Sequence, residues 1–232
     1  MITGQGKPDL LNDIELINLN GSCITSFGNY SMPLEGATGV FVKDMVLVCG
    51  GSNPEDYQDE CHTLHKGKTN FEFYKKLQEK RTLASSTVVQ ENMWITGGFN
   101  ETNSFLKSTE FIRPQHSYTI LNYTQNIDLP VPIRNHVILN LNETTSILLG
   151  GFLSYGFSDY TYFFNHVSNT WIIGPQMLNR RWDHTAGLIK DKGNGKEHIV
   201  VVGGHNHGEK KILVEILYNG ENIWREGINL NV

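Results

Sequence analysis

The segment His205-Asn206-His207, followed by Glu209, has the residue types of a metal site. Two imidazoles two positions apart in a glycine-flanked loop can reach one ion, and a carboxylate can complete the set. The sequence assures no third ligand, however, and such pairs arise by chance in a chain with nine histidines. We therefore expect a solvated loop here, with no metal and no cofactor.

The sequence lacks the motifs of several common enzyme sites. It contains no glycine-rich phosphate loop, no Gly-x-Ser-x-Gly nucleophile elbow and no paired zinc-binding cysteine motif. No coherent set of acid, base or metal-binding residues stands out among its polar residues. We therefore expect the protein not to be an enzyme.

Arginine is the residue type whose placement suggests binding. Arg81 and Arg134 each lie sixteen residues before a pair of adjacent glycines, and Arg181 lies twenty-two residues before another. The larger separation matches a polar insert, residues 190–198, that we interpret as a longer hairpin loop. Guanidinium groups that converge on one surface can bind carboxylates or phosphates. The alternative is that each arginine bonds backbone carbonyls of a neighbouring unit and holds the units together.

The elements that must position these arginines are marked by double glycines. Each pair closes a run of apolar, mostly β-branched residues, which predicts a strand followed by a tight turn. The pairs recur after 47, 53 and 53 residues, and a period near 50 indicates a repeat protein with four strands per unit. The four pairs are Gly50-Gly51, Gly97-Gly98, Gly150-Gly151 and Gly203-Gly204.

A second feature repeats in phase with the glycines. An aromatic residue falls twenty positions after each second glycine, where a large ring can pack between neighbouring sheets. A short alternating strand lies between the glycines and the ring, and contains Glu110 in one repeat and Glu215 in another. The four aromatic residues are Phe71, Tyr118, Trp171 and Trp224.

Together these features resemble the kelch-repeat family, over nearly the whole chain. The resemblance implies an all-β, kelch-type β-propeller of four complete four-stranded blades and a partial N-terminal blade. It implies a single domain, residues 1–232, with repeat units at about 1–31, 33–77, 80–123, 131–174 and 180–227. The sequence departs from the family pattern where Phe71 and Tyr118 replace tryptophan. The histidine that follows the arginine is clear only at His184, and is shifted at His136.

The blade count leaves two interpretations open. The chain opens at the second strand of one blade, so the first strand of that blade is missing. We expect a fragment of a six-bladed protein, which would also explain why no signal peptide is visible at the start. The alternative is a five-bladed ring closed by the short tail 227–232, because propellers pair strands from their two ends to remove an open edge.

The cysteines Cys23, Cys49 and Cys61 bear on the compartment. In the kelch frame Cys49 ends the second strand of a blade and Cys61 begins the third, which puts them within reach of a disulfide. Secreted invertebrate kelch-like proteins share the Val-Cys-Gly-Gly…Asp-Glu-Cys pattern, and this resemblance implies the secretory pathway. The alternative is buried free thiols in a cytosolic protein.

Five Asn-x-Ser/Thr sequons are compatible with secretion, although a chain rich in Asn, Ser and Thr produces some by chance. They lie at Asn20, Asn29, Asn100, Asn122 and Asn142.

The overall composition excludes two classes of partner. The 232 residues carry a net charge of −5 with both signs scattered, which argues against nucleic acid and against a basic membrane-surface patch. No apolar run approaches the length of a membrane span.

Four variable loops follow the double glycines, at 52–59, 99–105, 152–159 and 205–209. Variable loops on a rigid scaffold are where recognition concentrates, and aromatic residues mixed with Asn and Ser suit a protein interface. The alternative is that several rings tuck under the loops. The aromatic residues of these loops are Tyr57, Phe99, Phe105, Phe152, Tyr155 and Phe157.

We expect a non-catalytic module that binds an unidentified protein partner through the face made by the arginine turns and these loops. The predicted partner-binding residues are Tyr57, Arg81, Phe99, Arg134, Tyr155, Arg181, Trp182, His184 and His205.

Two other functions stay open. One is the remnant of a carbohydrate-active or galactose-oxidase-like enzyme, although the family's copper site needs a cysteine-linked tyrosine and all three cysteines lie within the first 61 residues. The other is a substrate-recognition fragment of a ubiquitin ligase adaptor, whose relatives carry an N-terminal oligomerisation domain that we do not find in this sequence.

Overall fold

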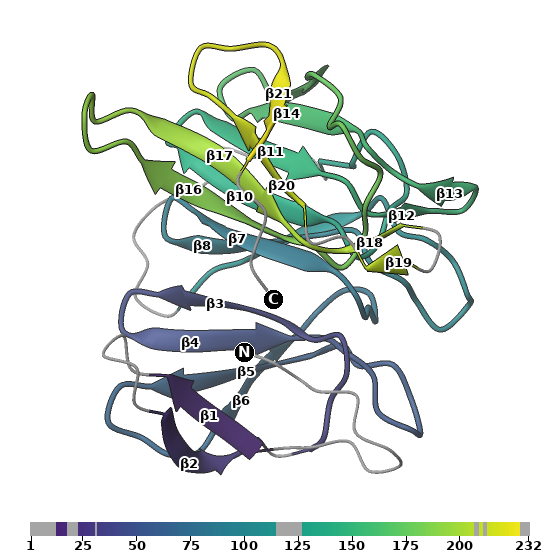
Figure 1. Cartoon of the computed structure of the whole chain (residues 1–232). Coiled ribbons are helices and arrows are strands. Elements are labelled where there is room, and N and C mark those ends of the chain that lie inside the picture. Colours follow the sequence, from purple (N-terminus) through teal and green to yellow (C-terminus); the bar gives the residue numbers. More distant parts are fainter. Residues whose placement is uncertain are drawn as a thin grey trace. The chain divides into compact units, whose positions relative to one another are not determined.

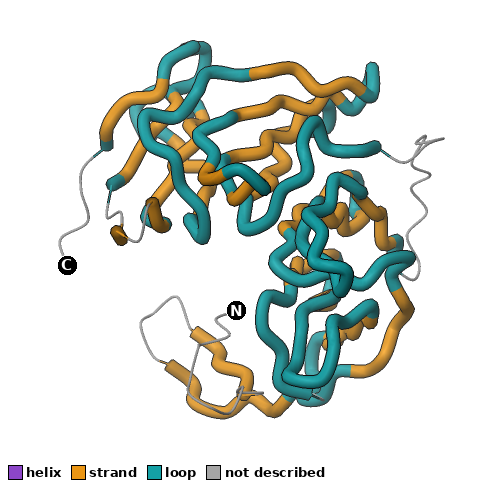
Figure 2. The backbone as a smooth tube through the Cα atoms, turned by 90° about the vertical axis from the view of Figure 1, so that its right-hand side faces the viewer, coloured by secondary structure: helices purple, strands orange, loops and turns teal. Residues whose placement is uncertain are grey.

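The computed structural model describes residues 13–17, 23–30, 32–114, 127–206, 209–210 and 213–227. All regular structure in these ranges is β-strand, and Figure 2 draws strands, loops and turns without a helix. Accordingly, the described ranges contain no helix that is long and apolar enough to cross a membrane. The chain divides into two compact units: residues 1–104 with 110–120, and residues 105–109 with 121–232.

The first unit contains a hairpin and two sheets whose strands pair in chain order (Figure 1). A fourth strand for the last sheet would fall in residues 115–126, which lie outside the described residues. The hairpin is β1 (Asp13–Ile17) and β2 (Cys23–Asn29). One sheet is β3 (Thr38–Val42), β4 (Met45–Cys49), β5 (Glu60–His65) and β6 (Glu72–Lys76). The other is β7 (Ser85–Val89), β8 (Asn92–Thr96) and β9 (Thr109–Ile112).

The second unit contains two four-stranded antiparallel sheets and two short hairpins (Figure 1). The hairpins stand in the loops that follow double glycines, and the predicted insert forms the long β16–β17 turn. The sheets are β10 (Val137–Asn142), β11 (Thr145–Leu149), β14 (Thr161–Asn165) and β15 (Thr170–Ile173), then β16 (Thr185–Lys190), β17 (Glu197–Val202), β20 (Val214–Leu217) and β21 (Trp224–Glu226). The hairpins are β12 (Phe152–Leu153) with β13 (Gly156–Phe157), and β18 (His205–Asn206) with β19 (Glu209–Lys210).

Burial falls from the second to the last strand of a sheet. Every residue of β8 is buried, and so are four of the five residues of β4 and of β11. A strand covered on both faces reads as a continuous apolar run, which explains the uninterrupted apolar stretch before each double glycine. By contrast, the last strands β6 and β15 are mostly exposed.

The double glycines hold two successive residues in the left-handed region. Gly50 and Gly51 have φ of 65° and 98°, and Gly150 and Gly151 have φ of 53° and 108°. A Cβ on Gly50 would lie 2.4 Å from the carbonyl oxygen of Arg81, which belongs to the segment leading into the next sheet. Both the φ angles and this close backbone approach therefore require glycine.

Each unit has a core between its two neighbouring sheets. Inner faces of both sheets contribute aliphatic side chains, as expected for sheets packed face to face. In the first unit this core contains Leu47, Cys49, Cys61, Leu77, Met93, Ile95 and Ile112. In the second unit it contains Ile147, Leu149, Met177, Ile199, Val201, Leu217 and Trp224.

The predicted disulfide between Cys49 and Cys61 is present. The two residues face each other directly in the register of β4 and β5, and both are buried in the core of the first unit. The bond therefore links the second and third strands of one sheet. The side chain of Cys23 lies outside the described residues.

The aromatic residues at the repeated position differ in burial. Trp224 is 2% exposed, and its indole Nε1 donates to the carbonyl oxygen of Pro175 (3.0 Å). Trp171 is half-buried, packs against Phe164 and donates to the carbonyl oxygen of Asp128 (3.0 Å). Each indole thus ties the last strand of its sheet to the segment that precedes the sheet. Phe71 packs against Tyr30 in the first unit, and Tyr118 lies outside the described residues.

These environments predict unequal effects of truncating the two tryptophans. Trp224→Ala should lower the free energy of unfolding by about 3–5 kcal/mol, because it empties a buried site and removes an indole hydrogen bond. Trp171→Ala should cost less, because part of its ring already meets water. Urea denaturation followed by intrinsic fluorescence and circular dichroism measures both. Equal midpoints for Trp224→Ala and the wild type would contradict the assigned packing.

Candidate interaction surface

The side chain of Arg81 is enclosed within the sheet that it precedes. It is 1% exposed, and its Nη1 donates to the carbonyl oxygen of Gly97 (2.9 Å) at the end of β8. Its Nη2 donates to the Glu110 carboxylate on β9 (2.9 Å). The other oxygen of Glu110 accepts from the backbone N–H of Gln78 (2.8 Å). The charge of Arg81 is therefore paired inside the protein.

Arg181 repeats this arrangement in the second unit. Its side chain is fully buried, and its Nη1 donates to the carbonyl oxygens of Gly203 (2.7 Å) and Leu213 (3.1 Å). Its Nη2 pairs with the buried carboxylate of Glu215, which also accepts from the backbone N–H of Leu178 (2.7 Å). A buried ion pair of this kind depends on hydrogen bonds to both ions. Here both Nη atoms of Arg181 and both oxygens of Glu215 are hydrogen-bonded, while the buried Nε of Arg181 has no hydrogen-bond partner among the described residues.

The arginine backbone links to the preceding sheet at the same time. The second glycine of that sheet donates its N–H to the arginine carbonyl, from Gly51 to Arg81 and from Gly151 to Arg181, both at 2.8 Å. Each arginine thus links two sheets: its backbone bonds the preceding sheet, and its side chain bonds its own sheet. This is the alternative role, of holding the units together, that the sequence left open. We call the place of Arg81 and Arg181 the staple position. Because their guanidinium groups are buried and paired, we exclude Arg81 and Arg181 from the candidate surface.

Arg134 does not occupy the same position as Arg81 and Arg181, although Arg81 and Arg134 lie equally far before their double glycines. The structural equivalence that this spacing predicts is therefore wrong for Arg134. The residue after each staple forms a bridge with the residue after the double glycine of its sheet: Thr82 with Phe99, and Trp182 with His205. Arg134 itself forms this bridge, with Phe152. Arg134 therefore corresponds to Trp182, and the buried Ile133 takes the staple position.

A β-bulge explains the one-residue offset. The register of β10 with β11 shifts between Asn140 and Asn142, so this hairpin holds one extra residue. A signal was present in the sequence. His184 follows Arg181 by three residues, whereas His136 follows Arg134 by two. His136 and His184 therefore occupy corresponding positions, whereas Arg134 is shifted by one residue relative to Arg181.

The staple position and its partner on the third strand change together. The buried pairs Arg81/Glu110 and Arg181/Glu215 occupy two sheets. In the other two sheets the same positions hold Leu34 with His62, and Ile133 with Tyr162, all buried. The carboxylate is thus present where the guanidinium is present, which is the pairing that burial of a charge demands.

The displaced Arg134 joins a group of aromatic rings on the loops of the second unit. Its guanidinium carbon lies 5.3 Å from the ring centre of Phe105 and 5.0 Å from that of Phe152. Both distances are within the range of cation–π attraction. The two rings lie 5.7 Å apart and flank the cation together.

The ring contacts continue from Phe152 across the loops 152–159 and 205–209. The centre of Phe157 lies 5.3 Å from that of Phe152, and it stacks within 6° of parallel on Trp182 at 6.1 Å. Trp182 in turn lies 5.3 Å from the imidazole of His205. All six side chains are half-buried, so each keeps part of its surface in water. We call this set the aromatic platform: Phe105, Arg134, Phe152, Phe157, Trp182 and His205.

The platform unites part of the predicted binding residues. Arg134, Trp182 and His205 are in it, and Tyr155, 73% exposed, lies in the β12–β13 hairpin next to Phe157. Tyr57 and Phe99 contact each other in the first unit, with ring centres 6.4 Å apart. Phe105, Phe152 and Phe157 were identified from the sequence only as loop residues, because their mutual contacts depend on the fold.

His184, one of the predicted partner-binding residues, is buried. It is 8% exposed, and burial, with the nearby Arg181 charge, lowers its pKa to about 3. His136 at the corresponding position is also buried, and burial lowers its pKa to about 3. Both imidazoles are therefore neutral at physiological pH, and we do not include His184 in the candidate surface.

A metal role for the 205–209 segment receives no support from the described side chains. Among them, no group of three His, Cys, Asp or Glu residues lies close enough to hold an ion. Of the segment itself, only the side chain of His205 is described, and it packs on Trp182. His207 and the side chain of Glu209 lie outside the described residues.

Comparison with known proteins identifies the fold. No protein-family model and no curated protein matches the sequence. Among 185 matching chains of solved structures, the one titled "Structure of YjhT" has a TM-score of 0.66 at 13% sequence identity. The match covers 87% of this chain and 66% of that chain, so the present chain spans slightly less than two thirds of its length. YjhT is a kelch-repeat β-propeller protein, and this chain has the same all-β fold, with the four-stranded sheets as blades.

The linked staple positions predict a compensating double substitution. Arg181→Ile alone, or Glu215→Tyr alone, should lower the free energy of unfolding by about 3–5 kcal/mol, because each leaves an unpaired buried charge. The double variant should recover much of that loss, since Ile133 and Tyr162 already fill these positions in the neighbouring blade. Urea denaturation of the four proteins gives the coupling energy. Strictly additive losses would contradict the linkage, and Arg225→Ala at the exposed Glu221 pair serves as a control with little expected change.

The buried histidines predict acid sensitivity above the range of the carboxylates. Because the pKa of His136 and His184 falls from 6.5 to about 3 on folding, the unfolded chain binds protons first as pH falls. Their contribution to stability should therefore be complete above pH 6.5 and be lost progressively between pH 6.5 and 3. Urea midpoints measured at intervals from pH 7.5 to 4 test this. His184→Gln should flatten the decline between pH 6.5 and 5, and a wild-type midpoint that stays constant there would refute it.

Proposed function

We propose that this chain is a non-catalytic interaction module, and that the aromatic platform binds a partner protein. The observation that carries the proposal is the continuous run of contacts from Phe105 to His205, which joins the loops that follow three successive double glycines. The non-catalytic part rests on the sequence, which contains none of the catalytic motifs considered above.

The composition of the platform suits a protein interface. Tryptophan, phenylalanine and arginine are enriched at the centres of interfaces, where the aromatic rings bury much area with few rotatable bonds. Because the platform rings are half-buried, one side of each ring packs against the protein and the other side can contact a partner. The exposed Tyr155 lies in the same β12–β13 hairpin, two residues before Phe157.

Backbone bridges hold the platform in place before any partner arrives. Arg134 and Phe152 exchange two backbone hydrogen bonds, at 3.1 and 2.8 Å. Trp182 and His205 do the same, at 3.3 and 2.9 Å. These bridges directly follow the second strands β11 and β17, so backbone hydrogen bonds fix the positions from which the rings project. Such preorganisation lowers the entropy lost on binding.

The charge of Arg134 indicates an acidic partner. Its guanidinium lies beside two rings and is partly shielded from water, so a carboxylate placed against it would interact more strongly than on an open surface. The partner that fits best therefore presents one or more carboxylates next to apolar side chains.

The first test is affinity capture with the immobilised chain, followed by titration calorimetry with the partner identified. Arg134→Ala and Trp182→Ala should each weaken binding by about 1–3 kcal/mol, and the effect of Arg134→Ala should shrink at high salt. Thermal melting of each variant shows whether the blades remain folded.

The matched control is Lys192→Ala, in the long β16–β17 turn at the other end of the strands. It also removes one positive charge but should leave affinity unchanged. Loss of binding in Lys192→Ala with full binding in Arg134→Ala and Trp182→Ala would place recognition on the hairpin turns and refute the proposal.

A further inference from the structure

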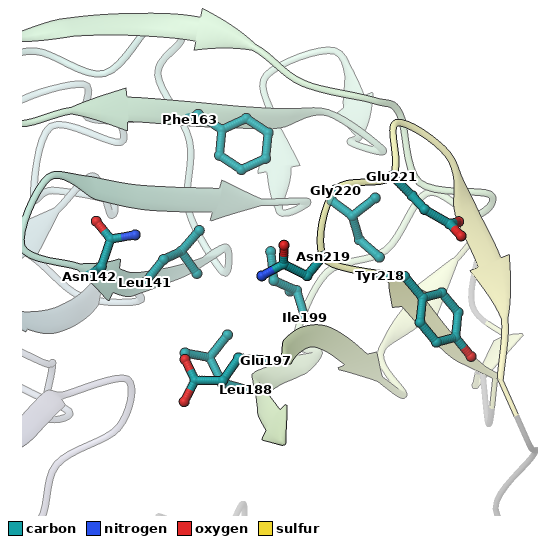
Figure 3. A pocket seen from close by; sticks show the side chains of 11 residues that line it. Leu141, Asn142, Phe163, Leu188, Glu197, Ile199, Tyr218, Asn219, Gly220 and Glu221 are labelled. Atoms are coloured by element: carbon teal, nitrogen blue, oxygen red, sulfur yellow. The ribbon is translucent and has the colours of Figure 1, made fainter. Parts of the chain in front are cut away.

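A pocket of about 230 Å³ opens between the two blades of the second unit, at the hairpin-turn end of the strands (Figure 3). It is distinct from the aromatic platform, because it involves Asn142 beside the β10–β11 turn, whereas Phe152 of the platform follows the opposite end of β11. Figure 3 shows Asn142 at one side of the pocket and Tyr218 at the other.

The lining combines apolar and hydrogen-bonding side chains. Phe163, Ile199 and Leu188 supply apolar surface, and Leu188 is 38% exposed on the first strand of its sheet, β16. Glu197 and Asn219 supply carboxylate and amide groups. An apolar face beside amide and carboxylate groups is the chemistry that holds a sugar ring, whose C–H face is apolar and whose edge carries hydroxyl groups.

Asn142 belongs to the sequon Asn142-Glu143-Thr144 and is exposed. Its Oδ1 accepts hydrogen bonds from the backbone N–H and the hydroxyl of Thr144, both at 2.9 Å. Among the described residues its Nδ2, the atom that an N-linked glycan would occupy, makes no hydrogen bond. A sugar attached there would displace no contact of the folded chain.

Asn100 is the other sequon whose side chain is described, and it differs in this respect. Its side chain is half-buried, and its Nδ2 donates to the Glu79 carboxylate (3.1 Å). Its Oδ1 also accepts from the backbone N–H of Ser104 (3.0 Å), which fixes the loop. A glycan on Asn100 would attach to the nitrogen that makes the bond to Glu79, on a side chain that is half-buried in its loop.

The disulfide supplies an independent indication of the compartment. Stable disulfides form where the environment is oxidising, and Cys49–Cys61 is buried in the core of the first unit. In eukaryotic cells the same compartment contains the enzyme that glycosylates sequons. The chain therefore combines an accessible acceptor, a neighbouring pocket and a bond characteristic of secretion.

We propose that Asn142 carries an N-linked glycan and that the first sugar of this glycan lies in the adjacent pocket. In the transfer step the Nδ2 of Asn142 attacks the anomeric carbon of a lipid-diphosphate-linked oligosaccharide. The new C–N bond replaces the C–O bond to the diphosphate, which leaves with its electron pair, and the Nδ2 proton is released. The sugar then covers Leu188 and Phe163, with its polar groups at Asn219 and Glu197.

Acceptor use is tested on the whole chain secreted from cultured eukaryotic cells behind a cleavable signal peptide. Glycopeptide mapping, with enzymatic release in ¹⁸O-labelled water, should find Asn142 occupied and Asn100 largely unoccupied. Asn142→Gln and Thr144→Ala should remove this glycan, Thr144→Ser should keep it, and Asn100→Gln is the matched control. An unmodified Asn142, or equal occupancy at Asn100, would overturn the assignment.

The seat of the first sugar is tested by thermal melting after two enzymatic treatments. Trimming to a single sugar should leave the melting temperature unchanged, and complete removal should lower it by about 2–4 °C. Because complete removal converts Asn142 to aspartate, the Asn142→Asp variant is the reference for that charge change. Leu188→Asp should abolish the difference between the trimmed and fully released proteins. Equal melting temperatures for the trimmed protein, the released protein and Asn142→Asp would show that the sugar does not occupy the pocket.

Discussion

The close approach of a double glycine to the backbone of the next blade is the constraint on which the rest of the structure depends. Gly51 and Gly151 donate to the carbonyl oxygens of Arg81 and Arg181 at 2.8 Å, and the two glycines of each pair have positive φ. A Cβ on the first glycine of either pair, Gly50 or Gly150, would lie 2.4 or 2.8 Å from the same carbonyl oxygens. The contact fixes where each blade begins relative to its neighbour within a unit, and so places the loops that follow the glycines.

The same junction is completed in two chemical ways. Two blades bury an arginine with a glutamate, and two fill the positions with uncharged side chains, Leu34 with His62 and Ile133 with Tyr162. Either solution leaves no unpaired charge inside, and this explains how repeats with little sequence in common share one fold. In the β10–β11–β14–β15 blade, Ile133 takes the staple position. Arg134 lies one residue after it and belongs to the aromatic platform.

The two ends of the strands have different chemistry. The post-glycine end of the second unit gathers rings and a cation on backbone that the junction has already fixed, which suits recognition of a partner. The hairpin-turn end has a pocket, exposed aliphatic side chains and a sequon. A glycan there would cover apolar surface at the end that the proposed partner does not use, and would leave the platform open.

The sequence alone determined the all-β class and the positions of the strands that end in double glycines, and it placed Cys49 and Cys61 within reach of each other while leaving free thiols open. These depend on local rules: apolar runs, glycine's access to positive φ, and the adjacency of consecutive strands. Only the tertiary structure separated Arg134 from Arg81 and Arg181, because a single bulged residue in β10 shifts the register without changing the spacing pattern noticeably. It also decided which loop rings meet, since Phe105, Phe157 and Trp182 are far apart in the chain and their contacts depend on how neighbouring blades pack.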